Sequence, residues 1–189
     1  MNGTNYITIG YNFLQIAINA IGEMKKQGNK TTLIMKGGLT DDEAWAEYDE
    51  LTKWNDNNIA IPVLFNFFHG SELILKGLIL HCGGDLGTKN HKLSDLLLKL
   101  KNCPSPPHKN VLDHFDKIIK NNGFEDFFKE HNTSTDSFYE IFKYPEFRNG
   151  NEIKFWMVRG NEKAGLEKFQ AIATLASGIK TEIIKWKSA

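Results

Sequence analysis

The segment from Ile59 to His81 constrains the fold of this chain more than any other feature of the sequence. When it is read with the period of a helix, its apolar residues fall on nearly every side. A helix at the surface of a protein carries an apolar stripe on one side only, so a helix that is apolar all round must be surrounded by other elements. The sequence therefore predicts a helical bundle with this segment at its centre.

Local signals set the limits of this central helix. We place its start near Asn58, so that Pro62 falls in the first turn, where the N–H group that proline lacks would have no intrahelical partner. The pair Gly83-Gly84 is expected to end it.

Three polar side chains interrupt the apolar segment on one face. His69, Glu72 and Lys76 are spaced i, i+3 and i+7, and a desolvated Glu or Lys needs a close partner. His91 and Asp95 follow soon after the Gly-Gly loop, at an i, i+4 spacing. We hypothesise that Glu72, Lys76, His91 and Asp95 form one polar cluster between two helices. A network that fixes helix register, or a solvated groove, is favoured over acid–base chemistry, because salt-linked helix pairs far outnumber active sites.

Helical periodicity covers most of the remaining chain. Apolar residues recur at threes and fours over residues 9–24, 93–100, 111–119 and 166–186, and a shorter helix is expected over 137–143. Residues 144–160 read as non-helical, with the IKFWMV stretch as a short strand or hairpin arm. The prediction is a single domain over residues 1–189 that is all-α, an up-and-down helical bundle of about six to seven helices with one irregular or short β excursion near residues 144–160.

The same periodicity predicts which side chains face the core. A capping box, Thr40 to Glu43, is expected to begin the second helix, and Asn161 to cap the last one. The residues expected to face inward on the first two helices are Ile9, Phe13, Ile16, Ala17, Ala20, Ile21, Met24, Ala44, Tyr48 and Leu51.

Composition narrows the classes of function. The 23 basic and 23 acidic side chains balance, and Arg148 and Arg159 are the only arginines. A protein that grips a phosphate backbone usually has a basic excess and uses Arg, so strong direct nucleic-acid binding is disfavoured, although a local patch is compatible with these totals.

Two further features indicate a cytoplasmic protein. Cys82 and Cys103 are the only cysteines, and the N-terminal residues lack the basic region of a secretory signal, so both thiols are expected to be reduced. No apolar run is expected to reach membrane-spanning length, because polar residues from Asn66 to Lys76 interrupt the longest one.

Two neighbouring patterns together resemble a known family. The first is Glu-Leu-x-Leu-Lys on an apolar helix, here residues 72–76. After a short Gly-containing loop comes His-x-Leu-x-x-Leu, here residues 91–96. This pair resembles the HEPN superfamily (higher eukaryotes and prokaryotes nucleotide-binding domain), especially its bacterial members related to abortive-infection proteins. The acidic helix with Trp45 and Tyr48, followed by an Asn-rich turn, fits the same outline.

The resemblance implies an up-and-down bundle that frequently forms homodimers and acts near RNA, nucleotides or phage-defence and toxin–antitoxin systems. It also implies a cognate antitoxin or a nucleotidyltransferase as a partner. Many active members are metal-independent ribonucleases that use an Arg followed at short distance by a His. Here Arg148 and Arg159 both lie after the last histidine, His131, so that motif is absent and the ribonuclease activity is not carried over.

Other chemistry is weaker in the sequence. His81, Cys82, Cys103 and His108 are zinc-ligand types, but their spacing matches no familiar metal knuckle, and no phosphate-cradling loop occurs. We therefore expect no metal and no cofactor. Residues 144–160 combine aromatics with cations, which stack bases and hold phosphates, although loops more often pack such aromatics against their own bundle. The candidate binding residues are Lys76, Tyr144, Arg148, Trp156 and Arg159.

Together these features predict a non-catalytic, HEPN-like binding or regulatory module linked to RNA, nucleotides or a defence system. One alternative is an enzyme, a divergent ribonuclease or nucleotide-directed hydrolase that uses His69, Glu72, His91 or Asp95. The other alternative is a purely structural dimerisation module.

Overall fold

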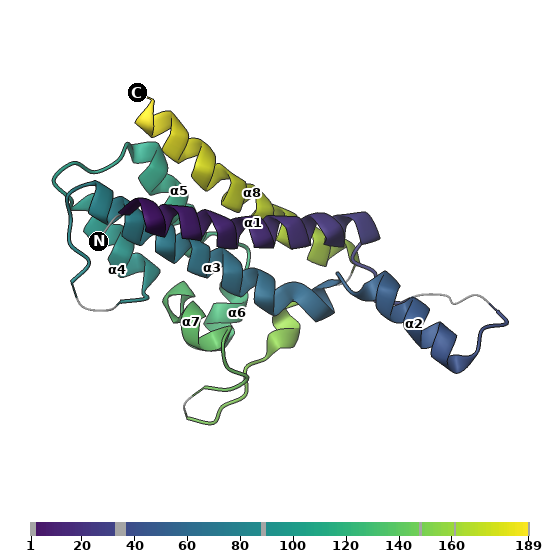
Figure 1. Ribbon diagram of the computed structural model, residues 1–189. Coiled ribbons are helices and arrows are strands. Elements are labelled where there is room, and N and C mark those ends of the chain that lie inside the picture. Colours follow the sequence, from purple (N-terminus) through teal and green to yellow (C-terminus); the bar gives the residue numbers. More distant parts are fainter. Residues whose placement is uncertain (1–2, 33–36, 88–89, 148, 161, 189) are drawn as a thin grey trace.

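The computed structural model describes residues 3–32, 37–87, 90–147, 149–160 and 162–188. In this part of the chain the fold is an all-α bundle, as predicted (Figure 1). The three long helices lie against one another, and most of the short helices after residue 90 pack against them. The helices are α1 (Gly3–Gln27), α2 (Asp41–Thr52), α3 (Asp56–His81), α4 (Leu93–Lys101), α5 (Lys109–Lys120), α6 (Glu125–Glu130), α7 (Phe138–Ile141) and α8 (Glu162–Lys187), with 3-10 turns at Thr135–Ser137 and Phe155–Val158.

Helix α3 is the central helix that the sequence predicts, and most of its residues are buried. Its start differs from the prediction, because the side chain of Asn55 accepts a hydrogen bond from the Asn58 amide and caps the helix at Asp56. Pro62 therefore lies in the second turn rather than the first, where it cannot donate to the carbonyl of Asn58. Its exposed ring faces away from the core.

The expectation that no apolar run reaches membrane-spanning length is wrong. Within Asp41–His81, a window of 18 residues is long and apolar enough to cross a membrane, despite the polar residues that interrupt it. However, 67% of that window is buried inside the protein. The core position of α3 accounts for this apolar character.

Glycines set the distance between α1 and α3, which run antiparallel. Gly10 lies so close to α3 that a Cβ atom added to it would be 2.7 Å from the carbonyl oxygen of Gly70. One heptad away, a Cβ atom on Gly3 would be 2.6 Å from the carbonyl oxygen of Gly77. Each helix therefore presents two glycines, seven residues apart, and the backbones touch where a side chain would hold them apart.

This contact determines which face of α1 is buried, and it corrects the prediction for that helix. The buried face follows a heptad pattern, whereas Ile9 and Ile16, predicted to face inward, are exposed. A hydrophobic period of 3.5 residues keeps one face of α1 against α3. Gly10 lies on that face but has no apolar side chain, so the apolar pattern of the sequence does not indicate that the face is buried. The buried residues of α1 are Ile7, Gly10, Leu14, Ala17, Ile21 and Met24.

Helix α2 forms an arm that projects from one end of the bundle (Figure 1). The predicted capping box is present, since Thr40 and Glu43 satisfy each other's backbone amides. The predicted inward stripe is wrong, because Leu51 is exposed and Tyr48 is only partly covered. Among the described elements, no helix packs extensively against α2.

A buried polar latch closes the base of this arm. The side chain of Asn29 accepts a hydrogen bond from the Asp56 amide (2.8 Å) and donates one to its carboxylate (3.1 Å). The same carboxylate accepts a hydrogen bond from the amide of Gly160 (2.8 Å), just before α8. The chain therefore leaves the bundle after Asn29 and returns to it at Asp56, at one point where α1, α3 and the approach to α8 meet.

The excursion before α8 contains no strand among its described residues. The IKFWMV stretch forms a 3-10 turn instead, and one isolated β-bridge joins Glu146 to Glu152. Ile153 and Val158 are buried in the bundle, so packing rather than strand pairing holds the segment. The irregular character was predicted correctly, but the short strand was wrong, and the predicted cap Asn161 lies outside the described residues.

Two glycines of α1 give a matched test of the helix contact. Gly10→Ala is expected to lower the free energy of unfolding by about 1–3 kcal/mol, because the added methyl group meets the backbone of α3. Gly22→Ala on the same helix has open space around it and is expected to raise the free energy of unfolding by about 0.5–1 kcal/mol. Urea denaturation of both variants measures this difference, and equal effects of the two substitutions would contradict the close approach.

Candidate functional site

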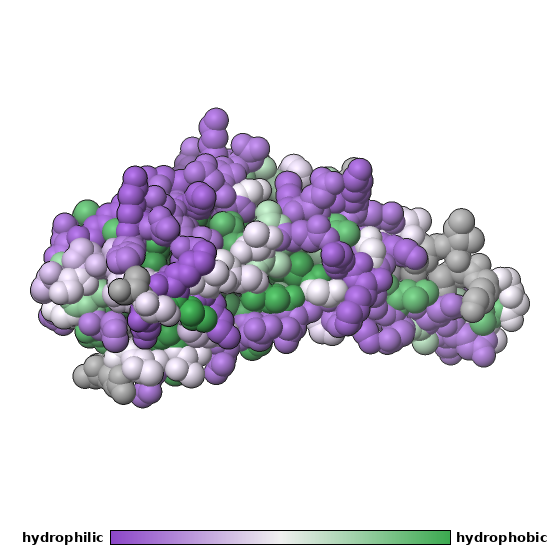
Figure 2. All heavy atoms as spheres, turned by 90° about the horizontal axis from the view of Figure 1, so that it is seen from above, coloured by the Kyte–Doolittle hydropathy of each residue, from purple (hydrophilic) through white to green (hydrophobic). Residues whose placement is uncertain are grey.

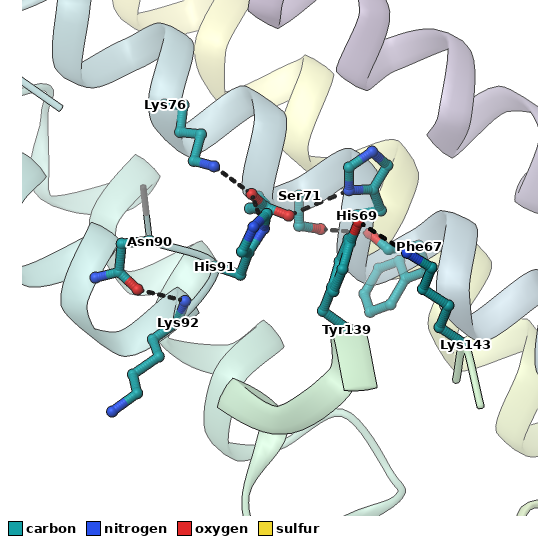
Figure 3. Close-up of polar contacts among 10 residues, drawn as sticks. Phe67, His69, Ser71, Lys76, Asn90, His91, Lys92, Tyr139 and Lys143 are labelled. Carbon is teal, nitrogen blue, oxygen red and sulfur yellow. Dashed lines mark hydrogen bonds and ion pairs between the residues drawn. The ribbon is translucent and has the colours of Figure 1, made fainter. Parts of the chain in front are cut away.

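The two halves of the HEPN-like sequence pattern meet at one carboxylate. Glu72 of α3 lies 2.5 Å from the Nζ atom of Lys76, one turn along the same helix. His91, in the loop before α4, approaches the same oxygen with its Nδ1 atom at 3.0 Å. His69 reaches the other oxygen with its Nδ1 atom at 3.1 Å (Figure 3). We call Glu72, His69, Lys76 and His91 the Glu72 cluster.

The chemistry of a carboxylate decides how these groups are protonated. An ionised carboxylate only accepts hydrogen bonds, so the Nδ1 atoms of His69 and His91 must both carry a proton when they bond to Glu72. In the neutral form of each ring, the Nε2 atom is then an acceptor that points away from Glu72. The cluster thus orients two imidazoles through one buried acid.

Burial distinguishes the members of the cluster. Glu72 is fully buried, whereas the side chain of His91 is 43% exposed. Burial alone would raise the pKa of Glu72, but the hydrogen bonds from His69 and Lys76 and the positive charge of Lys76 outweigh it, so the pKa is lowered. Glu72 therefore stays ionised at neutral pH and cannot touch a substrate, while His91 remains accessible.

An aromatic and a cation from α7 and the segment after it extend the cluster towards solvent. The ring of Tyr139 stacks on His91 with centroids 4.4 Å apart. Lys143 follows one turn later, with its Nζ atom 3.4 Å from the Tyr139 hydroxyl and 4.8 Å from the centre of its ring. The face that the protein presents at this point is thus an imidazole, a phenol and an exposed ammonium group (Figure 3).

The structure changes the membership of the predicted cluster. Asp95 is exposed and accepts a hydrogen bond from Asn90 at 3.0 Å. Glu72 is buried, and its hydrogen-bond partners are His69, Lys76 and His91 rather than Asp95. Because α4 begins at Leu93, His91 lies before the helix and not one turn from Asp95 on a helical face. The fourth member of the cluster is His69, which adds a second imidazole, and not Asp95 as predicted.

The candidate binding residues of the excursion differ in position from the cluster. Trp156 is 66% exposed on the 3-10 turn, and its carbonyl accepts a hydrogen bond from the amide of exposed Arg159 at 3.2 Å. Tyr144 is exposed as well, with the Nζ atom of Lys143 5.5 Å from the centre of its ring. Arg148 lies outside the described residues. Lys76, by contrast, is largely covered and committed to Glu72.

Cys82 and Cys103 lie close enough for their charges to interact, but no zinc-type histidine joins them to form a metal-binding group among the described residues. Within the described ranges, no group of three or more His, Cys, Asp or Glu side chains is arranged to hold a metal ion. Cys82 and Cys103 are buried and unlinked, and burial raises the pKa of the Cys82 thiol to about 11. Both thiols are therefore protonated at neutral pH and unreactive.

Sequence reasoning did not identify Tyr139 and Lys143 as part of the site. Their i, i+4 spacing on a short helix is visible in the sequence, but nothing in it indicates which tyrosine lies on His91. The contact depends on α7 packing against α3, far away in the chain.

Comparison of the chain with protein-family models, curated proteins and solved structures finds no match.

The Glu72 cluster predicts a pH-dependent stability. Because the pKa of Glu72 in the folded protein lies below its ordinary value of 4.5, the ionised group stabilises the fold above that pH. This stabilisation is lost as the pH falls through the lowered folded-state pKa. Glu72→Gln is expected to cost about 3 kcal/mol at neutral pH, with a difference from the native chain that shrinks under acid.

Urea denaturation of both chains between about pH 7 and about pH 3 measures this difference. Asp95→Asn is the matched control, because it removes an exposed carboxylate close by and is expected to change stability by less than about 0.5 kcal/mol. A Glu72→Gln effect that is equally large at all pH values would mean that its charge contributes nothing.

Proposed function

We propose that this chain is a HEPN-like helical module that binds RNA or a nucleotide without cleaving it. In this proposal it acts as a homodimer beside a partner of a defence or toxin–antitoxin system. The two halves of the family-like pattern support the relationship, because they are joined through one carboxylate. The exposure of Trp156, with exposed Arg159 three residues later in the chain, is the observation that carries the binding function.

The burial of Glu72 favours binding over catalysis. A carboxylate that serves as a general acid or base must come within hydrogen-bond reach of the substrate. Glu72 is fully buried and already accepts from three donors, so its arrangement suits a framework that holds His91 and Tyr139 in place.

The distribution of charge also favours an anionic ligand on the bundle. Helix α2 contains six acidic and no basic side chains, while the whole chain has 23 of each. The rest of the chain therefore carries six more basic than acidic side chains. The net charge of zero, which argued against a phosphate-bearing ligand, is the sum of an acidic helix α2 and a basic excess in the rest of the chain.

The excursion supplies the means of recognition. Exposed indole and phenol rings stack on bases, and neighbouring Lys and Arg side chains neutralise phosphates. Lys143 lies over the ring of Tyr144, and exposed Arg159 follows Trp156 by three residues at the end of the same 3-10 turn. Aromatic and cationic side chains together bind single-stranded nucleic acids without strong sequence preference.

A titration tests the binding proposal. The native chain is expected to bind a fluorescently labelled single-stranded RNA or a nucleotide saturably, and more weakly at about 200 mM than at about 50 mM salt. Trp156→Ala is expected to weaken binding by about tenfold, the magnitude of one lost stacking contact. Ile184→Ala is the control, because it removes an exposed apolar side chain on α8, away from the excursion.

Fluorescence anisotropy measures both affinities. No saturable binding of RNA or of nucleotides by the native chain would contradict the proposal. Equal losses in Trp156→Ala and Ile184→Ala would contradict the assignment of the surface.

One observation favours the enzyme as a second candidate. His91 is half-exposed and is oriented through Nδ1 by a buried carboxylate, which is how many catalytic bases are held. If His91 acts in this way, the native chain cleaves RNA and His91→Ala lowers the rate by about 10²-fold or more. If the binding proposal holds, both chains show the same background cleavage.

A further inference from the structure

His131, at the end of α6, is held by hydrogen bonds at both nitrogens of its ring. Its Nδ1 atom lies 2.7 Å from the carbonyl oxygen of Phe127, one turn back on the helix. Its Nε2 atom accepts a hydrogen bond from the backbone amide of Lys154 at 2.9 Å. A carbonyl only accepts and an amide N–H only donates, so Nδ1 must carry a proton and Nε2 must not. The two bonds therefore require the neutral ring in one tautomer.

The bond to Lys154 joins α6 to the segment of residues 145–159, which we call the anchored loop. The described residues of this loop make hydrogen bonds to the rest of the protein only through Lys154. Its amide donates to His131, and its Nζ atom pairs with Glu130 at 2.5 Å. The other bonds of the loop are internal, such as the one from the Phe147 amide to the Asn151 carbonyl. Lys154 is thus the polar anchor of the loop on the bundle.

Apolar contacts hold the loop in a different way. Ile153 is buried, and the ring of Phe155 stacks on that of Phe127 with centroids 6.5 Å apart. The ring of His131 lies between Phe127 and Phe147, with centroids 4.7 Å and 5.8 Å away. Because apolar contacts carry no titratable group, they persist when the charge of His131 changes. Loss of the Lys154 bond therefore loosens the loop without detaching it.

The loop has room to move. It projects below the bundle in Figure 1, whereas the arm formed by α2 extends from one end of it (Figures 1 and 2). The described residues near its tip, Asn149, Gly150 and Asn151, are exposed. The position of the loop thus depends on its own contacts with the bundle.

Charged groups around His131 affect its protonation. Glu130, Glu152 and Lys154 line a hollow of about 440 Å³ together with His131. The hydrogen bond and the charge of Lys154 hold the pKa of Glu130 below its ordinary value, and the charge of a protonated His131 acts in the same direction. Glu130 is therefore ionised wherever histidine titrates. The two carboxylates favour a charged ring, and Lys154 opposes it.

A proton on Nε2 changes what the ring can bind. An imidazolium has two donors and no acceptor, so it cannot accept a hydrogen bond from the amide of Lys154. The two N–H groups would then point at each other, and the ring must give up this contact. The carboxylates of Glu130 and Glu152, which line the same hollow, are acceptors for the new donor.

We propose that His131 is a pH-sensitive clasp for the anchored loop. Neutral His131 holds the backbone of Lys154 against the end of α6, and protonated His131 releases it. Histidine ordinarily changes charge between about pH 5 and 8, so the clasp opens in mild acid. Trp156 and Arg159 follow Lys154 in the chain, so opening also displaces the proposed binding surface. That consequence alone rests on the proposed function.

Nuclear magnetic resonance of the isotope-labelled, full-length chain tests the clasp. At about pH 8 the ring of His131 is expected to be neutral with its proton on Nδ1, as read from the shifts of its two nitrogens. As the pH falls to about 5, the amide signal of Lys154 is expected to move with the same midpoint as the ring. Its protection against hydrogen exchange, relative to the intrinsic rate at each pH, is expected to fall roughly two- to tenfold for the one lost bond.

His131→Gln is the matched variant, because a side-chain amide offers both a donor and an acceptor at every pH. It is expected to abolish the pH dependence of the Lys154 amide. His108→Gln is the control, because it removes an exposed histidine just before α5. It is expected to leave that pH dependence unchanged.

The native chain alone decides the main point. A Lys154 amide that does not follow the ring of His131 overturns the clasp, and so does a ring that stays neutral down to about pH 5 or carries its proton on Nε2 at about pH 8. This decision stands even if His131→Gln fails to fold. An equal shift in a folded His131→Gln overturns the assignment to His131. None of these measurements uses RNA or a nucleotide, so a chain that binds neither contradicts the proposed function and leaves the clasp intact.

Discussion

The close approach of α1 and α3 is the contact on which the rest of the structure depends. Glycines at Gly3, Gly10, Gly70 and Gly77 let the two backbones touch where residues 3–10 of α1 meet residues 70–77 of α3. Because α1 occupies this side of α3, the short helices and α8 must cover its other sides. The polar stripe of α3 then lies between α1 and the α4–α7 side, where Phe13 of α1 meets His69 edge to face.

The Glu72 cluster follows from that packing. A carboxylate enclosed by apolar helices is destabilising unless several donors reach it. Helix α3 and the loop before α4 supply the donors to Glu72, and α7 supplies the tyrosine ring that covers His91. The result is a rigid polar seam with one accessible imidazole. Because His91 lies just before α4, this seam joins the start of α4 to α3.

Charge is segregated in space although it is balanced in total. The latch between Asn29 and Asp56 separates an acidic arm from a basic body, and it does so with buried hydrogen bonds at the base of the arm. Both surfaces thereby become available for intermolecular contacts of opposite character.

Local sequence determined the helices themselves: the capping box of α2, the leucines that α4 buries and the apolar face of α8 all follow from periods and caps that involve near neighbours. The pairing of Glu72 with Lys76 is local in the same sense, and the approach of His91 agreed with the hypothesis. Only the tertiary structure decided that His69 and not Asp95 completes the cluster, that Tyr139 covers His91, and that α2 projects as an arm. These contacts depend on the angles and distances between helices. Glycines set the closest of those distances, and because a glycine has no side chain, the spacing of apolar residues in the sequence does not indicate where such a contact lies.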